Sequence, residues 1–156
     1  MAGEKKLQEV INKLRKINEF VSTEMDVIVQ REETRFVKAN NDALDQGQNS
    51  EDDTLHYLKP RVDNTDPYTN KYSKYKRRVG GRTSVVDLKL SGDWRRAIKL
   101  IKTKKNTFVL DSSDYKTDFL ESNYGEDILG IQESKLDIIS KDMEVKINKS
   151  VDNYIK

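Results

Sequence analysis

The feature that most constrains the fold is a long amphipathic pattern near the N-terminal end. Apolar residues recur there in steps of three and four positions, at Leu7, Val10, Ile11, Leu14, Ile17, Val21, Met25 and Ile28. This spacing predicts one apolar stripe along an α-helix, and neither Pro nor Gly interrupts residues 5–38. At ~1.5 Å per residue the helix would be roughly 50 Å long. A small domain cannot cover such a helix alone, so we expect a kink or a second chain against its far part.

Composition restricts the classes of function. Apolar residues make up 35% of the 156 residues and charged residues 36%, against about 45–50% and about 25% in typical globular chains. One small core is therefore expected, with neighbouring subunits burying the remaining apolar surface. The chain has no cysteine and a single histidine, His56, which excludes disulfides and thiolate metal sites and disfavours zinc. We expect no cofactor and no bound metal.

Charge and hydropathy bear on partners and location. The net charge is +2, so a nucleic-acid interface would have to come from a local basic segment. No apolar run approaches the ~20 residues that span a bilayer. The N-terminus leads straight into the amphipathic pattern and lacks the apolar core of a signal peptide. We therefore expect synthesis in a cytoplasm and no membrane partner.

The chain divides into three stretches of one domain: a helix over residues 1–39, a polar loop and basic connector over 40–84, and an α+β core over 85–156. Residues 40–54 are polar and acidic with almost no apolar anchor, which predicts a mobile loop. Apolar residues around Pro60 and Pro67 then indicate an extended connector that touches a surface intermittently.

The connector contains the one concentrated positive segment. Residues 71–84 hold no acid, and tyrosines interleave with six cations: Lys71, Lys74, Lys76, Arg77, Arg78 and Arg82. Such a segment can neutralise phosphates while its tyrosines stack on bases. It can equally hold an acidic patch of a protein partner, or remain a solvated loop that keeps the protein soluble. The sequence leaves these three interpretations open.

The remaining residues predict an antiparallel sheet with helices packed on it, an α+β arrangement. Residues 85–90 alternate as a half-buried strand should. Asp93 is placed to cap a helical turn that begins at Trp94. Residues 98–103 and 107–111 form a predicted β-hairpin. A helix starting at residue 113 or 114 ends at Gly125, a predicted left-handed C-cap, and a last helix follows a capping box of Ser134 and Asp137.

Four aspartates are candidate catalytic groups, but the structural interpretation of each is favoured. Asp87, Asp93, Asp111 and Asp114 could serve a metal-dependent nuclease. Each also lies where local backbone chemistry favours an aspartate, at a helix start, a strand end or the wet face of a strand. Gly80-Gly81 lacks the spacing of a phosphate-binding loop, and no nucleophile elbow is present. We expect no enzymatic activity. Trp94, the only tryptophan, is expected in the core, with an interface position as the alternative.

Residues 86–131 carry short motifs in a distinctive order. Asp87-Leu88-x-Leu90-Ser91-Gly92-Asp93 is followed by an Ile-rich segment, by Phe-Val-Leu-Asp-Ser, and by Tyr124-Gly125-x-x-Ile128-Leu129-Gly130. This order resembles the small neck and tail-completion proteins of tailed phages. Two positions depart from the family pattern: Ser91 stands where Thr is common, and Leu129 where Phe is common.

The resemblance implies a structural subunit of the virion, assembled in the host cytoplasm. Such proteins form rings that join the portal-side connector to the tail, so the implied partners are other copies, other neck, portal-side and tail proteins, and genomic DNA threading the channel non-specifically. The matched positions and their tryptophan neighbour look fold-defining rather than catalytic: Asp87, Gly92, Asp93, Trp94, Tyr124, Gly125 and Gly130. The alternative to a ring subunit is a DNA-binding accessory module that uses residues 71–82.

Overall fold

The computed structural model describes residues 2–56, 70–89 and 91–156. In chain order its elements are α1 (Ala2–Arg31), α2 (Glu33–Gln46), α3 (Asn70–Arg78), α4 (Asp93–Arg96), β1 (Ile98–Lys104), β2 (Thr107–Ser112), α5 (Thr117–Tyr124), a 3-10 turn η1 (Glu126–Ile128) and α6 (Glu133–Ile155). Helices and a two-stranded antiparallel sheet confirm the α+β class. None of the helices in these residues has the length and apolar character needed to cross a bilayer.

The long N-terminal helix is present and is interrupted once, at Glu32. It then continues as α2 through Gln46, so the predicted loop over residues 40–54 is wrong for its first half. Ala43 and Leu44 are 1% and 0% exposed, because they prolong the stripe that Phe36 and Ala39 carry at helical spacing. Polar neighbours on the outer side of α2 had hidden this continuation. The rest of the stretch is also ordered, with a bridge between residues 48 and 54 and a buried Leu55.

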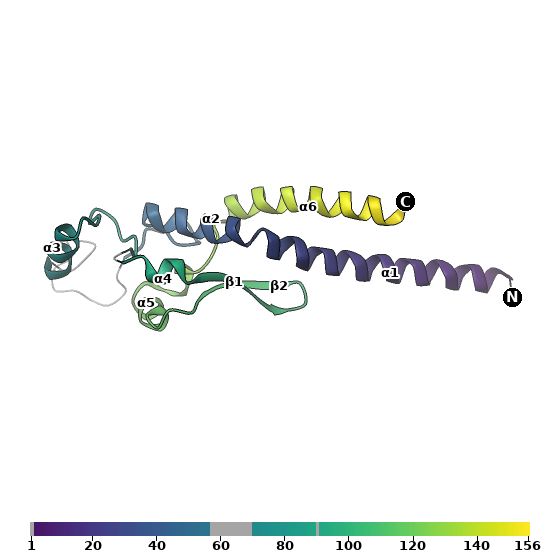
Figure 1. The fold of residues 1–156 in the computed structure, drawn as a ribbon, viewed down its shortest axis with the longest axis horizontal. Helices are drawn as coiled ribbons and strands as arrows, with labels where there is room; N and C mark the ends of the chain where they lie inside the picture. The colour runs from purple at the N-terminus through teal and green to yellow at the C-terminus, as the bar shows by residue number, and fades with distance from the viewer. Residues whose placement is uncertain (1, 57–69, 90) are drawn as a thin grey trace.

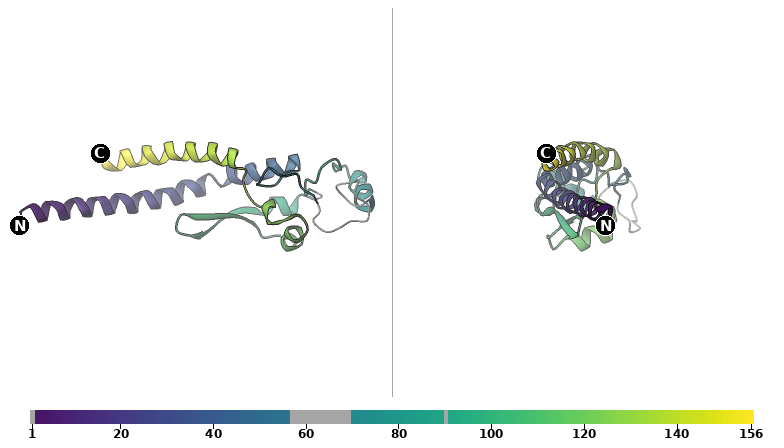
Figure 2. Two further views of the ribbon diagram at one scale, coloured as in Figure 1. Left: turned by 180° about the vertical axis from the view of Figure 1, so that it is seen from behind. Right: turned by 90° about the vertical axis from the view of Figure 1, so that its right-hand side faces the viewer.

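The helices and the hairpin form an elongated molecule (Figure 1). Helix α6 runs antiparallel to α1, and the ring of Tyr154 stacks on that of Phe20 with centroids 4.1 Å apart. The β1–β2 hairpin contacts α1 as well, since Lys102 pairs with Asp26 at 2.6 Å. The first turns of α1 extend beyond both α6 and the hairpin, as both side-on views show (Figures 1 and 2).

Two apolar clusters make up the core. The larger contains Leu44, Leu55, Val86, Trp94, Ile98 and Ile128, and the smaller contains Phe36, Ala39 and Ile139. Trp94 is 3% exposed, and its Nε1–H donates to Thr117 Oγ1 at 3.0 Å. The expected core position of Trp94 is confirmed, with its polar nitrogen satisfied as burial demands.

The predicted strand over residues 85–90 is wrong for residues 85–89, and Leu90 lies outside the described residues. The sheet of the described residues has two strands, β1 and β2, so no neighbour pairs with this segment. Val86 is buried, while Leu88 takes a positive φ of 50°. The Lys89 N–H donates to Asp87 Oδ1 at 2.9 Å, a side-chain turn that replaces strand hydrogen bonds. The predicted hairpin is confirmed, with Ile98 opposite Ser112.

Several helix ends differ from the prediction in detail. Gly92 occupies the N-cap of α4 with a φ of 81°, and Asp93 is the first helical residue instead. Helix α5 begins at Thr117, later than predicted. Helix α6 begins at Glu133 with Gln132 at its N-cap, so the capping box at Ser134 is wrong. Gly125 has a φ of 98° and a ψ of 156°; its φ is positive as predicted, but its ψ lies far from a left-handed cap.

Candidate interaction surfaces

The basic segment forms helix α3 rather than a loop. Lys74, Arg77 and Arg78 are exposed on it, as is Arg82 beyond its end. Arg78 lies over the ring of Tyr75, with 5.6 Å between the guanidinium carbon and the ring centroid. The side chain of Lys71 lies outside the described residues. Four of the six cations that the sequence suggests for binding are therefore exposed, where a ligand or a protein partner can reach them.

Lys76 is the exception among these cations. Its side chain is 0% exposed, and its ammonium pairs with Asp87, whose side chain is 6% exposed. Asp87, expected on the wet face of a strand, is therefore buried. Since an ammonium needs a compensating charge once water is removed, this ion pair fixes α3 to residues 86–89. Lys76 thus serves the fold and is not available to a phosphate.

Two arginines hold the C-terminal end of α2. Arg82 donates to the carbonyl oxygen of Asp45 at 3.0 Å. The buried Arg95 donates to Asp45 Oδ1 at 2.6 Å and to Asn41 Oδ1 at 2.7 Å. The hydrogen bond from Arg95 holds the pKa of Asp45 below its usual range. The role of Arg95 was missed, because an arginine one position after the tryptophan carries no sequence signal for burial.

The motif residues within 124–130 also serve packing. A Cβ at Gly130 would lie 2.5 Å from the Cβ of Ser50, so only glycine allows this approach. Asn40 Nδ2 donates to the carbonyl oxygens of Ile128 and Gly130, at 2.9 Å each. Tyr124 packs against the larger apolar cluster. The contribution of Asn40 was missed because its stretch was interpreted as a loop.

The candidate nuclease carboxylates do not converge. Asp93 pairs with Arg96, and Asp114 Oδ1 accepts the Lys116 N–H at 2.9 Å. Asp111 Oδ1 accepts the Ser112 N–H at 2.7 Å, and Asp87 is taken by Lys76. Among residues 2–56, 70–89 and 91–156, no three His, Cys, Asp or Glu side chains are grouped so as to hold a metal ion. Each aspartate has a local structural role.

No family model, no curated protein and no solved structure matches this chain. Its surfaces are therefore interpreted from exposure, charge and contacts. Large apolar side chains are exposed at several places on the described residues, and one group on α1 and one group around α5 are among the most exposed.

The first surface, called the α1 stripe below, consists of Leu7, Val10 and Leu14. These side chains are 61%, 52% and 60% exposed, although they share one face of α1 by their spacing of three and four. The same stripe is covered further along, where Ile28 is 5% exposed. The apolar pattern of the helix therefore continues beyond the point where the chain covers it.

The second surface, called the α5 surface, consists of Tyr115, Asp118, Phe119 and Glu121. Tyr115 and Phe119 are 88% and 62% exposed. Burial and repulsion from Glu126, Asp111 and Asp118 raise the pKa of Glu121. Lys116 lies over the Tyr115 ring at 5.2 Å. The surface is thus an aromatic pair beside a group of acids.

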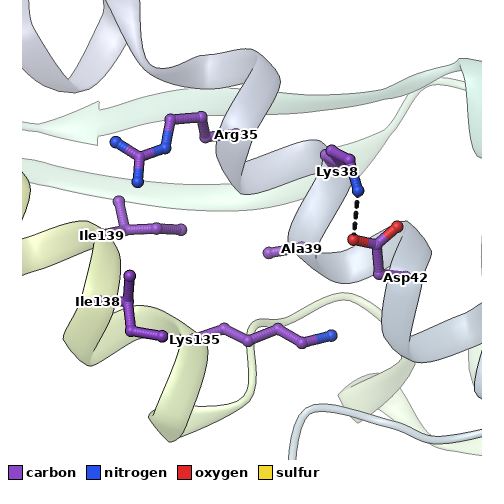
Figure 3. Close-up of a pocket in the computed structure, with 7 residues that line it drawn as sticks. All are labelled: Arg35, Lys38, Ala39, Asp42, Lys135, Ile138 and Ile139. Carbon is purple, nitrogen blue, oxygen red and sulfur yellow. Dashed lines mark hydrogen bonds and ion pairs between the residues drawn. The ribbon is translucent and has the colours of Figure 1, made fainter.

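Two cavities lie beside α6. One, of about 190 Å³, is lined by Arg35, Lys38, Ala39, Asp42, Lys135, Ile138 and Ile139 (Figure 3). Lys38 pairs with Asp42 there at 2.5 Å. The other, of about 330 Å³, is lined mostly by apolar side chains of the hairpin and of the segment leading into α6. Both are open and lack a group of converging catalytic side chains.

Proposed function

We propose that this chain is a structural protein of a phage virion, one subunit of a ring that joins the head connector to the tail around the DNA channel. The order of motifs over residues 86–131 is the first support. The roles of those motif residues are the second: Asp87, Trp94 and Gly130 hold the fold through an ion pair, a buried ring and a close backbone approach.

The α1 stripe is the observation that carries the proposal. Burying a Leu or Val side chain stabilises a protein by roughly 1.5–3 kcal/mol relative to leaving it in water. Three such side chains in a row therefore favour a covering partner. A helix without tertiary contacts is also only marginally stable in water, because most helix stability comes from packing of its apolar face. In a larger particle, a neighbouring chain would both bury these three side chains and stabilise the first turns of α1.

Imaging the parent particle by cryo-electron microscopy tests the proposal directly. Copies of the chain are expected in the neck or tail, with the α1 stripe covered by another chain. A matched pair of variants then tests the stripe. Leu7, Val10 and Leu14 replaced by Ser should block incorporation, whereas Gln8, Lys13 and Arg15 replaced by Ser should not. Particles that contain no copy of the chain would end the proposal.

A DNA-binding accessory module is the second candidate function. The exposed Lys74, Arg77, Arg78 and Arg82 around α3 favour it. Because each phosphate contact contributes about 0.9 to the slope of log K against log salt concentration, replacing Arg77 and Arg78 by Ala should lower that slope by about 2. Replacing Lys99 and Lys141 on other surfaces should leave it unchanged. No binding to duplex DNA at low salt would eliminate this candidate.

A further inference from the structure

Helix α3 presents a mixed basic and apolar face to solvent. Ser73 and Lys76 are buried and define its inner side. On the outer side lie two pairs at a spacing of four residues, Lys74 with Arg78 and Tyr75 with Val79. Tyr75 and Val79 are 44% and 53% exposed. These four residues are called the α3 surface.

The α3 and α5 surfaces complement each other. Each has two exposed apolar side chains, Tyr75 and Val79 on one, Tyr115 and Phe119 on the other. Lys74 and Arg78 flank the first pair; Asp118 and Glu121 flank the second, where Lys116 also lies over the Tyr115 ring. Burial is the main cause of the raised pKa of Glu121, and repulsion from Glu126, Asp111 and Asp118 adds to it, so a cationic partner would favour the charged form of Glu121. Since both surfaces are exposed in one chain, neither covers the other.

We propose that the α3 surface of one copy docks on the α5 surface of a second copy. Tyr75 and Val79 would lie against Tyr115 and Phe119, with Lys74 and Arg78 beside Asp118 and Glu121. Both surfaces lie at the end of the molecule far from its two termini (Figure 1). The contact joins different patches on the two copies, so each copy keeps one free patch for the next copy. Closure into a ring rests on the function proposed above; the contact itself rests on the two surfaces.

A single contact of this kind is weak. Four apolar side chains and their charged neighbours cover less than the about 800 Å² per partner of a standard interface. In a ring each copy makes two such contacts, and the other ring components hold the copies at high effective concentration. Association of the purified chain is therefore expected to be reversible and to weaken as salt rises.

The absence of cysteine from the sequence allows a clean cross-linking test. Val79→Cys and Phe119→Cys are introduced into separate full-length copies, which are mixed and oxidised. We expect the mixed disulfide to exceed the Val79→Cys homodimer several-fold. A matched control pairs Val79→Cys with Val145→Cys, since Val145 is 68% exposed on α6. Equal yields for the test pair and the control pair would overturn the proposal.

Charge reversal tests the electrostatic part of the contact in the same assay. Lys74→Glu with Arg78→Glu in the Val79→Cys copy should reduce the yield several-fold. Adding Asp118→Lys and Glu121→Lys to the Phe119→Cys copy should restore it, because the charges are then opposite again. As a control, Asp137→Lys with Glu144→Lys on α6 should have no effect. Circular dichroism of each variant verifies folding, and failure of the doubly reversed pair to recover contradicts the proposal.

The remaining outcomes separate this contact from the two candidate functions. Cross-linking of the purified chain, together with its absence from virions, would refute the ring and keep the contact. A ring in the virion in which α3 and α5 of neighbouring copies are apart would refute the contact and keep the function. If Lys74→Glu with Arg78→Glu abolishes duplex binding but leaves cross-linking unchanged, the α3 surface serves DNA and the proposed contact is wrong.

Discussion

The buried ion pair of Lys76 and Asp87 allows a sharp test of how α3 is held. Asp87→Asn preserves the shape of the side chain and an oxygen that accepts the Lys89 N–H. It removes only the negative charge beside an ammonium that is 0% exposed. The substitution therefore tests the charge of Asp87 with little change in the shape of the side chain.

The magnitude follows from burial. Removing one partner of a buried ion pair costs about 3–5 kcal/mol, since the other charge remains without compensation. This is a large part of the ~5–15 kcal/mol that stabilises a typical domain. A second response would be release of the 9-residue helix α3 from the core, which would bring Lys76 into water. If releasing α3 costs less free energy than keeping the charge of Lys76 buried, the protein takes that route. The measured loss of global stability is then limited to about the free energy of releasing α3.

Two measurements distinguish these responses. Urea unfolding followed by circular dichroism gives the free energy of unfolding, which we expect to fall by about 3 kcal/mol if α3 stays docked. If α3 is released, the fall is smaller, and trypsin cleaves faster after the exposed Lys74 and Arg78. The double variant Lys76→Met with Asp87→Asn removes both charges and should recover most of the loss. Asp137→Asn, on an exposed carboxylate of α6, is the matched control.

The reasoning is refuted by a specific result. If Asp87→Asn changes neither the free energy of unfolding nor the rate of cleavage relative to Asp137→Asn, the pair does not hold α3. A double variant no more stable than Asp87→Asn alone would show that the charge of Lys76 was not the cause of the loss.

Three further predictions concern single charges. Hydrogen bonds from Lys146 and a neighbouring arginine lower the pKa of Glu32. The charged form of Glu32 therefore stabilises the fold fully above the ordinary glutamate range, and this stabilisation is lost as pH falls through the lowered pKa. In thermal melts, Glu32→Gln should reduce the loss of melting temperature at acid pH. Lys135 Nζ is buried with no hydrogen-bond partner among the described residues, and Lys135→Met should raise the free energy of unfolding by about 1–3 kcal/mol in urea titrations. Glu121 has a raised pKa, which destabilises the fold when the group is charged; Glu121→Gln should be more stable than the parent at pH 7, and the difference should vanish below the ordinary glutamate range.

The sequence predicted elements whose signal is local. The long helix and the C-terminal helix follow from apolar residues at steps of three and four, the hairpin follows from two short segments that flank residues 104–106, and all three are present. Trp94 was predicted in the core from its size and its place after a turn, and it is buried. These features depend on residues close in sequence, so residue type and spacing were sufficient to predict them.

The errors involve partners far apart in sequence. Residues 40–46 were predicted as a loop because they are largely polar and acidic, and the local sequence does not show that Asn40 donates to carbonyl oxygens near residues 128–130. Residues 85–90 were predicted as a strand because apolar and polar residue types alternate there, but the structure buries the consecutive Val86 and Asp87, which strand geometry would place on opposite faces. Distinguishing a strand from an irregular segment requires knowing that no neighbouring strand is available, which is tertiary information.

The candidate surfaces also have some features set by the sequence and others set by the tertiary structure. The sequence by itself determined the apolar stripe of α1, the basic character of residues 71–84 and the aromatic residues of α5, because residue type and spacing fix them. Only the tertiary structure decided which of these residues reach solvent. It buried Lys76 against Asp87 and left Leu7, Tyr115 and Phe119 exposed. Exposure depends on which segments pack together, and that packing is a property of the whole chain.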